Sequence, residues 1–253
     1  MAWVESSLGT FRARHDSADQ RDARRVLQSL EIARLRLHSL FERQPDEITV
    51  VLHRTVVSLS LTNPLLPVAW LTTAPAARRY IAGWANAREL HVLAPAALRA
   101  RASNVPGSRE MLTLSAAVLY TRRVIAENNV DLPSRLPPVR IRRELHWAWL
   151  LEGSARWFSG QTDHARPAIA RRLREGAPPS FPPGLRDAPL LGGTVIDLLA
   201  REEGELAAAR FASRLHPQGA RAAIAGVFGG RGFVHTEGAW RSHLTRLAGA
   251  VQA

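Results

Sequence analysis

The sequence of 253 residues contains no cysteine and no lysine, and both absences narrow the chemistry that it can support. Without cysteine there are no disulfides, thiolate zinc sites, iron–sulfur clusters or cysteine nucleophiles, so a metal would need histidine and carboxylate ligands. Without lysine the nucleotide-binding motif G-x-x-x-x-G-K-[ST] is excluded. The G-x-S-x-G turn of many hydrolases is missing too, as is a G-x-G-x-x-G turn after a strand.

Long hydrophobic runs are also missing. No stretch approaches the ~18 to 20 consecutive apolar residues that a membrane helix needs, and the N-terminal MAWVESSLGTFRARHD lacks the basic and then apolar pattern of a signal peptide. Hydrophobic residues still make up 46% of the chain, which is enough for a sizeable core. We therefore expect a cytoplasmic globular protein with no membrane partner.

Basic residues are plentiful but of one kind. All 34 are arginine and the formal net charge is +12, a balance that suits nucleic acid or another acidic surface. The arginines are spread along the chain, however, and no nucleic-acid-binding motif lies among them. Such one-sided usage is more typical of codon bias in a GC-rich genome, so a nucleic-acid partner is kept only as an alternative.

The expected strands all lie in the first hundred residues. They cover residues 9–14, 47–54, 80–84 and 89–93. After the first of them, the pattern from Ser17 to Gln20 resembles a capping box, and it is followed by apolar residues at helical spacing. This predicts a long amphipathic helix that ends near Arg43, while residues 63–76 are expected to be irregular because they contain several prolines.

The remainder of the chain is expected to be helical. Helices are predicted over 110–128, about 141–159 and about 165–175, and glycines mark the ends of further helical segments towards the C-terminus. Strands followed by helices indicate an α+β fold. We expect one domain over residues 1–253, with an α/β lobe over 1–103 and a helical lobe over 104–253 that share a core.

The sequence WLLEGSARWFSG, residues 149–160, surrounds Glu152 with apolar side chains, and a carboxylate there must either face water or meet a positive group. Its W-L-x-E-G-x-A pattern, preceded by EITVVL, GWANARELHVLAP and a central helix, resembles the gluzincin metallopeptidases, the peptidase MA-like zinc proteases. The resemblance implies a zincin-like fold in which an N-terminal helix and a small mixed sheet pack on the central helix. It places Glu152 at the third zinc-ligand position, with Gly153 and Ala155 keeping the helix slim enough to approach its neighbour.

In that family the central helix carries HExxH, whose two histidines bind zinc while the glutamate serves as general base. The resemblance aligns Val118 and Arg122 with the histidines and Leu119 with the glutamate, and residues 110–129 contain no histidine. A catalytic zinc ion needs three protein ligands and an open position. We therefore expect no zinc, no other cofactor and no catalytic residues.

Glu152 then needs another partner. We expect the Arg122 guanidinium to stand where zinc would be and to form an ion pair with Glu152. The simpler interpretation is a local pair with Arg156, one helical turn later on a solvent-exposed face. His146 is a candidate ligand of a rewired metal site, although a histidine beside tryptophan is more often packed or at the surface. His91, in a predicted strand, is expected to form a cross-strand hydrogen bond.

The residues Trp84, Ala85 and Asn86 occupy the place where, in gluzincins, a strand edge holds the substrate backbone by β-augmentation. A residual peptide-binding edge is therefore one interpretation, and a simple turn explains the same residues equally well. The leading hypothesis is a catalytically inactive pseudopeptidase that binds a peptide or protein partner. The alternatives are an active metal-dependent hydrolase with a rewired site and an arginine-rich nucleic-acid-binding protein, and the oligomeric state stays open.

Overall fold

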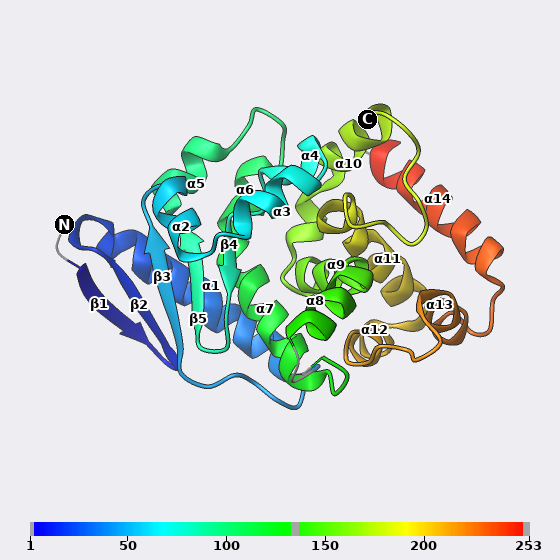
Figure 1. Ribbon diagram of the computed structural model, residues 1–253, viewed down its shortest axis with the longest axis horizontal. Helices are drawn as coiled ribbons and strands as arrows, with labels where there is room; N and C mark the ends of the chain where they lie inside the picture. The colour runs from blue at the N-terminus through cyan, green and yellow to red at the C-terminus, as the bar shows by residue number, and fades with distance from the viewer. Residues whose placement is uncertain (1–2, 133–136, 250–253) are drawn as a thin grey trace.

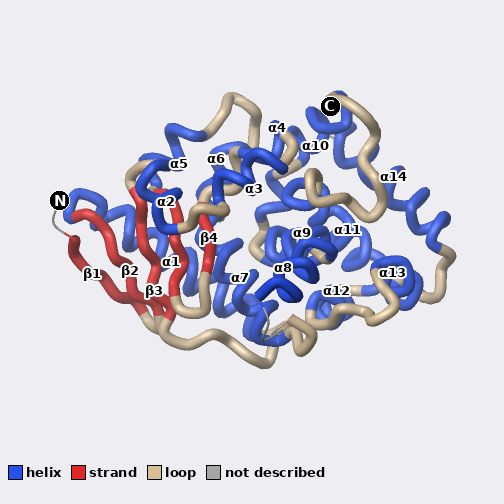
Figure 2. The backbone as a smooth tube through the Cα atoms, in the orientation of Figure 1, coloured by secondary structure: helices blue, strands red, loops and turns tan. Residues whose placement is uncertain are grey.

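A computed structural model describes residues 3–132 and 137–249 of the chain. A small sheet lies at one end of the molecule and the helices of the second half of the chain lie at the other (Figures 1 and 2). All described strands come before residue 94 and only helices follow. The expected α+β fold class is confirmed at this level.

The sheet is mixed and has five strands in the order β1-β2-β3-β5-β4. They are β1 (Trp3–Leu8), β2 (Phe11–Asp16), β3 (Ile48–His53), β4 (Gly83–Ala85) and β5 (Glu89–Leu93). The central strands β2, β3 and β5 are parallel, whereas β1 and β4 are antiparallel edge strands. β3 and β5 match the prediction closely, β2 and β4 only in part, and β1 was not predicted.

The two faces of the sheet differ. The buried face carries the alternating side chains Phe11, Ala13, Ile48, Val50, Leu52, Leu90 and Val92. It packs against α1 (Gln20–His38), which runs behind the strands in Figure 1, and against α7 (Ser115–Asn128), which meets β4 and β5. The opposite face is exposed on β2, at Arg12 and Arg14, but it is buried on β3 and β5, where the helix after β3 packs against it. Period-two alternation thus gives these two strands two buried faces, and α7 lies on the first of them beside the antiparallel edge.

The predicted start and end of α1 are wrong. The side chain of Asp16, not Ser17, makes the cap: Asp16 Oδ1 accepts from the backbone N–H of Ala18 at 3.0 Å and begins a 3-10 turn. The helix proper runs from Gln20 to His38 and stops short of Arg43. Its buried residues, Ala23, Leu27, Leu30 and Leu37, form an apolar stripe against the sheet that includes only part of the expected one.

The proline-containing segment is more regular than expected. It forms α3 (Leu66–Thr72) and α4 (Pro75–Arg78). Two further unpredicted helices are α2 (Val56–Thr62), which precedes the segment, and α5 (Pro95–Arg101), which follows β5. Proline supports the starts of α3, α4 and α5 because its fixed φ suits the first turn of a helix, where no N–H donor is needed. The prolines that predict irregular structure in the sequence therefore mark the beginnings of helices.

Two helices predicted as single elements are divided. Residues 108–128 form α6 (Ser108–Thr113) and α7, separated at Leu114, whose ψ of 2° interrupts the helix. In the same way α8 (Pro137–His146) and α9 (Ala148–Phe158) are separated at the buried Trp147, where ψ is 15°. The break turns α9 relative to α8 and lets both reach α7 with their acidic residues.

The C-terminal helices complete the helical part of the molecule, and the second and third of them pack directly against α9. They are α10 (Arg166–Arg174), α11 (Ala188–Glu203), α12 (Glu205–Ala212), α13 (Ala220–Val227) and α14 (Phe233–Gly249). The buried apolar residues of sheet and helices belong to one connected cluster that extends from Phe11 to Leu247. No described helix has the length and apolar content needed to cross a membrane.

Candidate functional site

The three positions aligned with HExxH lie on α7 as expected for one helical motif, but their chemistry differs from a zinc site. Val118 and Leu119 are 5% and 8% exposed and offer only hydrocarbon, while Arg122 carries a positive charge. In a chain without cysteine, a zinc site requires imidazole or carboxylate donors. These residues therefore do not fit a zinc ion.

The predicted pair between Arg122 and Glu152 is present. Arg122 Nη1 lies 2.7 Å from Glu152 Oε1, which joins α7 to α9, and Arg122 Nη2 lies 3.3 Å from Glu144 Oε2 on α8. The Glu152 carboxylate raises the pKa of Arg122 against the opposing effect of burial, and Glu144 adds to the rise. The Arg122 side chain is 40% exposed, so water screens its outer part.

The simpler interpretation, a pair of Glu152 with Arg156, is present at the same time. Glu152 Oε2 lies 3.6 Å from Arg156 Nη2, but the Arg156 side chain is only 6% exposed, so this is no solvated surface pair. Burial lowers the pKa of Arg156, and the Arg122 charge lowers it further, while Glu152 opposes both. Glu152 thus lies between two guanidinium groups, one at the surface and one buried.

The network continues beyond Arg156 into the core. Arg156 Nη1 donates to the Oε1 of the fully buried Gln161, and Gln161 Nε2 donates to the backbone oxygen of Met111 on α6 at 2.6 Å. The Nε of Arg156 is buried and has no hydrogen-bond partner among the described residues. Charges and hydrogen bonds therefore connect α6, α7, α8 and α9 around Glu152. Sequence reasoning missed Glu144 and Gln161 because neither lies in the motif.

Gly153 does allow a close helix contact, and the neighbour that it approaches is α11. A methyl group on Gly153 would lie 2.3 Å from the backbone carbon of Gly192, and one on Gly192 would lie 2.4 Å from the Trp149 carbonyl oxygen. Helices α9 and α11 consequently touch backbone to backbone. Ala155 is fully buried in the same core. Gly153 therefore lets α9 pack closely against α11, while the neighbouring Glu152 faces α7.

The edge strand β4 lies directly against α7. A methyl group on Gly83 would be 2.8 Å from Leu119 Cδ1 and 2.3 Å from the His91 carbonyl oxygen, so only glycine permits this approach. Trp84 stacks on His91 with ring centroids 4.3 Å apart, and its Nε1 donates to Thr62 Oγ1 at 2.9 Å. Leu119, at the general-base position, thus borders the strand edge.

Asn86 behaves as the turn residue of the simpler interpretation. Its Oδ1 accepts from the backbone N–H groups of Arg88 and Glu89, at 2.9 and 2.7 Å, and this closes the hairpin between β4 and β5. Trp84 and Ala85 lie in the strand itself. The strand-edge interpretation therefore applies to Trp84 and Ala85, and the simple-turn interpretation applies to Asn86.

The outer edge of β4 carries backbone groups without partners. The pairs Asn86–Glu89 and Ala82–Leu93 are hydrogen-bonded, so by antiparallel alternation Trp84 bonds to His91 while Gly83 and Ala85 point their N–H and C=O groups away from β5. No other described residue donates to or accepts from these groups. An open strand edge of this kind is a template for another strand.

The residues proposed for a rewired metal site are not brought together. His146 lies exposed on α8, where its ring makes an edge contact with Trp147 at 5.7 Å. Within residues 3–132 and 137–249, no three histidine, aspartate or glutamate side chains converge in a way that could hold a metal ion.

A pair of buried histidines was predicted only in part. His53 Nε2 lies 3.1 Å from His91 Nδ1, which confirms a cross-strand hydrogen bond for His91, and His91 Nε2 lies 3.3 Å from Glu89 Oε2. Burial lowers the pKa of His53 to about 4, and the neighbouring His91 adds to the effect. Burial also lowers the pKa of His91, although Glu89 opposes this. Both histidines are therefore neutral near pH 7.

A second buried polar cluster joins the C-terminal helices. His243 Nε2 lies 2.8 Å from Asp197 Oδ2, and Arg201 and Trp157 also donate to this carboxylate, at 3.0 and 3.2 Å. Burial would raise the pKa of Asp197, but the three hydrogen bonds outweigh it and bring that pKa to about 2. The cluster connects α9, α11 and α14, and its partners become apparent only once these helices are placed together.

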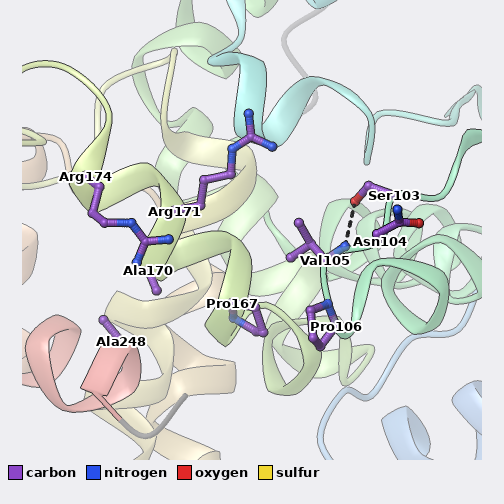
Figure 3. A pocket seen from close by; sticks show the side chains of 9 residues that line it. All are labelled: Ser103, Asn104, Val105, Pro106, Pro167, Ala170, Arg171, Arg174 and Ala248. Atoms are coloured by element: carbon purple, nitrogen blue, oxygen red, sulfur yellow. Dashed lines mark hydrogen bonds between the residues drawn. The ribbon is translucent and has the colours of Figure 1, made fainter. Parts of the chain in front are cut away.

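The surface hollow in Figure 3 lies elsewhere. Its volume is about 520 Å³, and the side chains of Arg171 and Arg174, both from α10, border it opposite the turn at Ser103 to Pro106. Arg171 Nε is already paired with Glu175 Oε1 at 2.6 Å. None of the predicted site residues lines this hollow.

Arginines among the described residues form ion pairs in several parts of the molecule. Many of them pair with carboxylates, and these pairs are distributed over the sheet and over α1, α7, α10, α11 and α14. This distribution gives the nucleic-acid alternative no support.

Comparisons with protein-family models, with curated proteins and with solved structures find no match to this chain.

Proposed function

We propose that the protein is a catalytically silent relative of gluzincin metallopeptidases that binds a peptide, or an extended segment of a protein, along β4. The observation that carries the proposal is the 2.7 Å contact between Arg122 of α7 and Glu152 of α9, at the positions that the resemblance assigns to a zinc ligand pair. Helices distant in the sequence meet there through a cation and a carboxylate. The guanidinium supplies the positive charge that a metal would supply in the family.

The same positions argue against hydrolysis by the family's chemistry. A general base at residue 119 would have to accept a proton, and Leu119 has no group that can do so. Val118 cannot donate an electron pair to a metal. What is retained is the arrangement of an edge strand, a central helix and a glutamate-bearing helix, without the reactive groups.

Binding is supported by the free edge of β4. Gly83 and Ala85 direct unpaired N–H and C=O groups outward beside α7, which is the geometry that β-augmentation uses. Main-chain pairing there would add one strand to the existing sheet and would need no catalytic residue. Peptide binding is thus the function that the site can perform with the groups that it has.

The register of the resemblance can be tested by restoring the missing ligands. The triple variant Val118→His, Leu119→Glu, Arg122→His should bind zinc in near-stoichiometric amount, measured by metal analysis after dialysis. Because Arg156 lies 3.6 Å from Glu152 and repels a cation, adding Arg156→Gln should tighten binding. The control carries Glu152→Ala on the triple variant and should lose the metal. A folded triple variant that binds no more zinc than this control would contradict the proposed relationship.

A further inference from the structure

An unusual apolar surface lies on α2 and α3. Five large side chains there are more than half exposed: Val57 69%, Leu61 81%, Leu65 63%, Val68 52% and Leu71 75%. We name these five residues the apolar strip. Summed over the five residues, the exposed surface is on the order of 500 Å², and so much exposed apolar surface on two consecutive helices is a candidate interaction site.

The strip also lacks charge in a chain that is otherwise rich in it. From Thr55 to Ala77 no residue is charged, although the protein as a whole has a net charge of +12. The strip residues offer a charged ligand no attraction and would remove water from its charges at a cost, although the Arg101 guanidinium lies 5.3 Å over the ring of Trp70 on α3. The chemistry of the strip therefore selects an uncharged, apolar occupant.

The strip adjoins the open edge of β4. Thr62, at the end of α2, accepts the hydrogen bond from Trp84 Nε1, and Trp70 of α3 donates through its Nε1 to the Ile81 carbonyl at 2.9 Å, just before the strand. In Figure 1, α2 and α3 lie at the end of the sheet where β4 begins. The strip and the strand edge thus form neighbouring parts of one surface.

The size of the strip favours a peptide over a second copy of the chain. A stable interface of standard size buries ~800 Å² on each partner, and the strip alone falls short of this. An extended segment that pairs with β4 needs less apolar area, because main-chain hydrogen bonds supply part of the affinity. Alternate side chains of such a segment lie on the face occupied by Trp84, towards Thr62 and the strip.

We infer that the apolar strip selects the side chains of an extended apolar peptide whose backbone pairs with the edge of β4. This inference rests on the proposed function and names its ligand class: a polypeptide segment with large aliphatic residues at alternate positions and no charge between them. The edge of β4 holds the backbone and the strip sets the specificity.

The test uses the full chain and two fluorescein-labelled peptides of equal length. One has leucine at alternate positions and the other has glutamine at the same positions, and fluorescence anisotropy measures binding. The strip variant is Leu61→Gln with Leu65→Gln, and its matched control is Ile32→Gln with Leu35→Gln on α1, where the side chains are 70% and 64% exposed. The edge variant is Ala85→Pro, which removes the outward N–H and leaves the bonds to β5 intact.

We expect wild type to prefer the leucine peptide and the strip variant to bind it about tenfold more weakly, with the glutamine peptide unaffected. The α1 control should bind both peptides as wild type does. Ala85→Pro should weaken both peptides equally. Loss of binding in Ala85→Pro, with the strip variant unchanged, would overturn the inference and leave the proposed function intact.

Other outcomes would overturn the proposed function as well as the inference. If Ala85→Pro binds the leucine peptide as tightly as wild type does, or if wild type binds neither peptide, the proposed pairing with β4 is wrong and the inference falls with it. Two further measurements test rival occupants. A wild-type dimer in sedimentation that the strip variant abolishes would assign the strip to a second copy of the chain. Binding of wild type, but not of the strip variant, to phosphatidylserine vesicles would assign it to a membrane.

Discussion

Neutralising Glu152 should destabilise the protein more than removing the partner that is visible at the surface. Glu152→Gln keeps the shape of the side chain but removes the charge that lies between Arg122 and Arg156. The consequences for the two arginines differ because the Arg122 side chain is 40% exposed and that of Arg156 only 6%. Water can solvate the Arg122 guanidinium when its partner is lost, but it cannot reach most of the Arg156 side chain.

The magnitude follows from this difference in burial. Removing one partner of a buried ion pair costs ~3–5 kcal/mol, because the other charge stays buried without compensation. Glutamine retains an oxygen that can accept from Arg156, and Glu152 itself is 20% exposed, so the lower end of that range, about 3 kcal/mol, is expected. Arg122→Gln removes a partly exposed cation and should cost only about 1 kcal/mol.

Urea unfolding followed by tryptophan fluorescence gives both free energies, since Trp149 and Trp157 lie on α9 and Trp147 lies at its start. A third variant isolates the cause. In an Arg156→Met background the buried cation is gone, so Glu152→Gln should then cost about 1 kcal/mol or less. An equal cost of Glu152→Gln and Arg122→Gln, or an unchanged cost in the Arg156→Met background, would refute the claim that Glu152 compensates the buried Arg156.

Two further predictions concern other parts of the chain. Burial lowers the pKa of His53 from 6.5 to about 4, so the unfolded chain takes up a proton at a higher pH than the folded chain does, and the free energy of unfolding should fall by up to ~3 kcal/mol as the pH drops from 6.5 towards 4. In His53→Gln, the free energy of unfolding measured in urea should depend less on pH over that range, and an unchanged dependence would contradict the assignment. Gly153→Ala should destabilise the protein by about 3 kcal/mol in thermal or urea unfolding, because the new methyl group would lie 2.3 Å from the Gly192 backbone. The control Gly238→Ala, with open space around it on α14, should leave the stability unchanged or raise it by up to ~1 kcal/mol. Equal effects of the two substitutions would count against the close contact.

Sequence patterns were most informative where one face of an element is buried. β3 and β5 are buried at every position except the half-buried Thr49 and Glu89, and their apolar runs predicted their limits to within about a residue. β1 is mostly exposed, so WVESSL contains no alternation that would reveal it. The breaks at Leu114 and Trp147 are also invisible in sequence, because both residues are compatible with a helix and only tertiary packing sets their backbone angles.

At the candidate site, the resemblance predicts one contact but not the residues around it. The pair of Arg122 with Glu152 could be expected because the family's motif places these two positions together. The roles of Glu144 and Gln161 could not, since both depend on how α8 and the turn after α9 pack against α7. The meeting of His53 and His91 likewise depends on the parallel register of β3 and β5, which no local pattern encodes.

The arrangement of charges bears on whether a metal could return to this position. Glu144, Arg122, Glu152 and Arg156 alternate in sign along one chain of contacts, so the four charges compensate each other. A divalent cation beside Glu152 would add two positive charges next to Arg156, whose pKa burial already lowers. Histidines at positions 118 and 122 would not remove that repulsion. The buried arginine, as much as the missing ligands, therefore favours a guanidinium over a metal as the partner of Glu152, and this is why Arg156→Gln should strengthen any zinc binding that the restored ligands create.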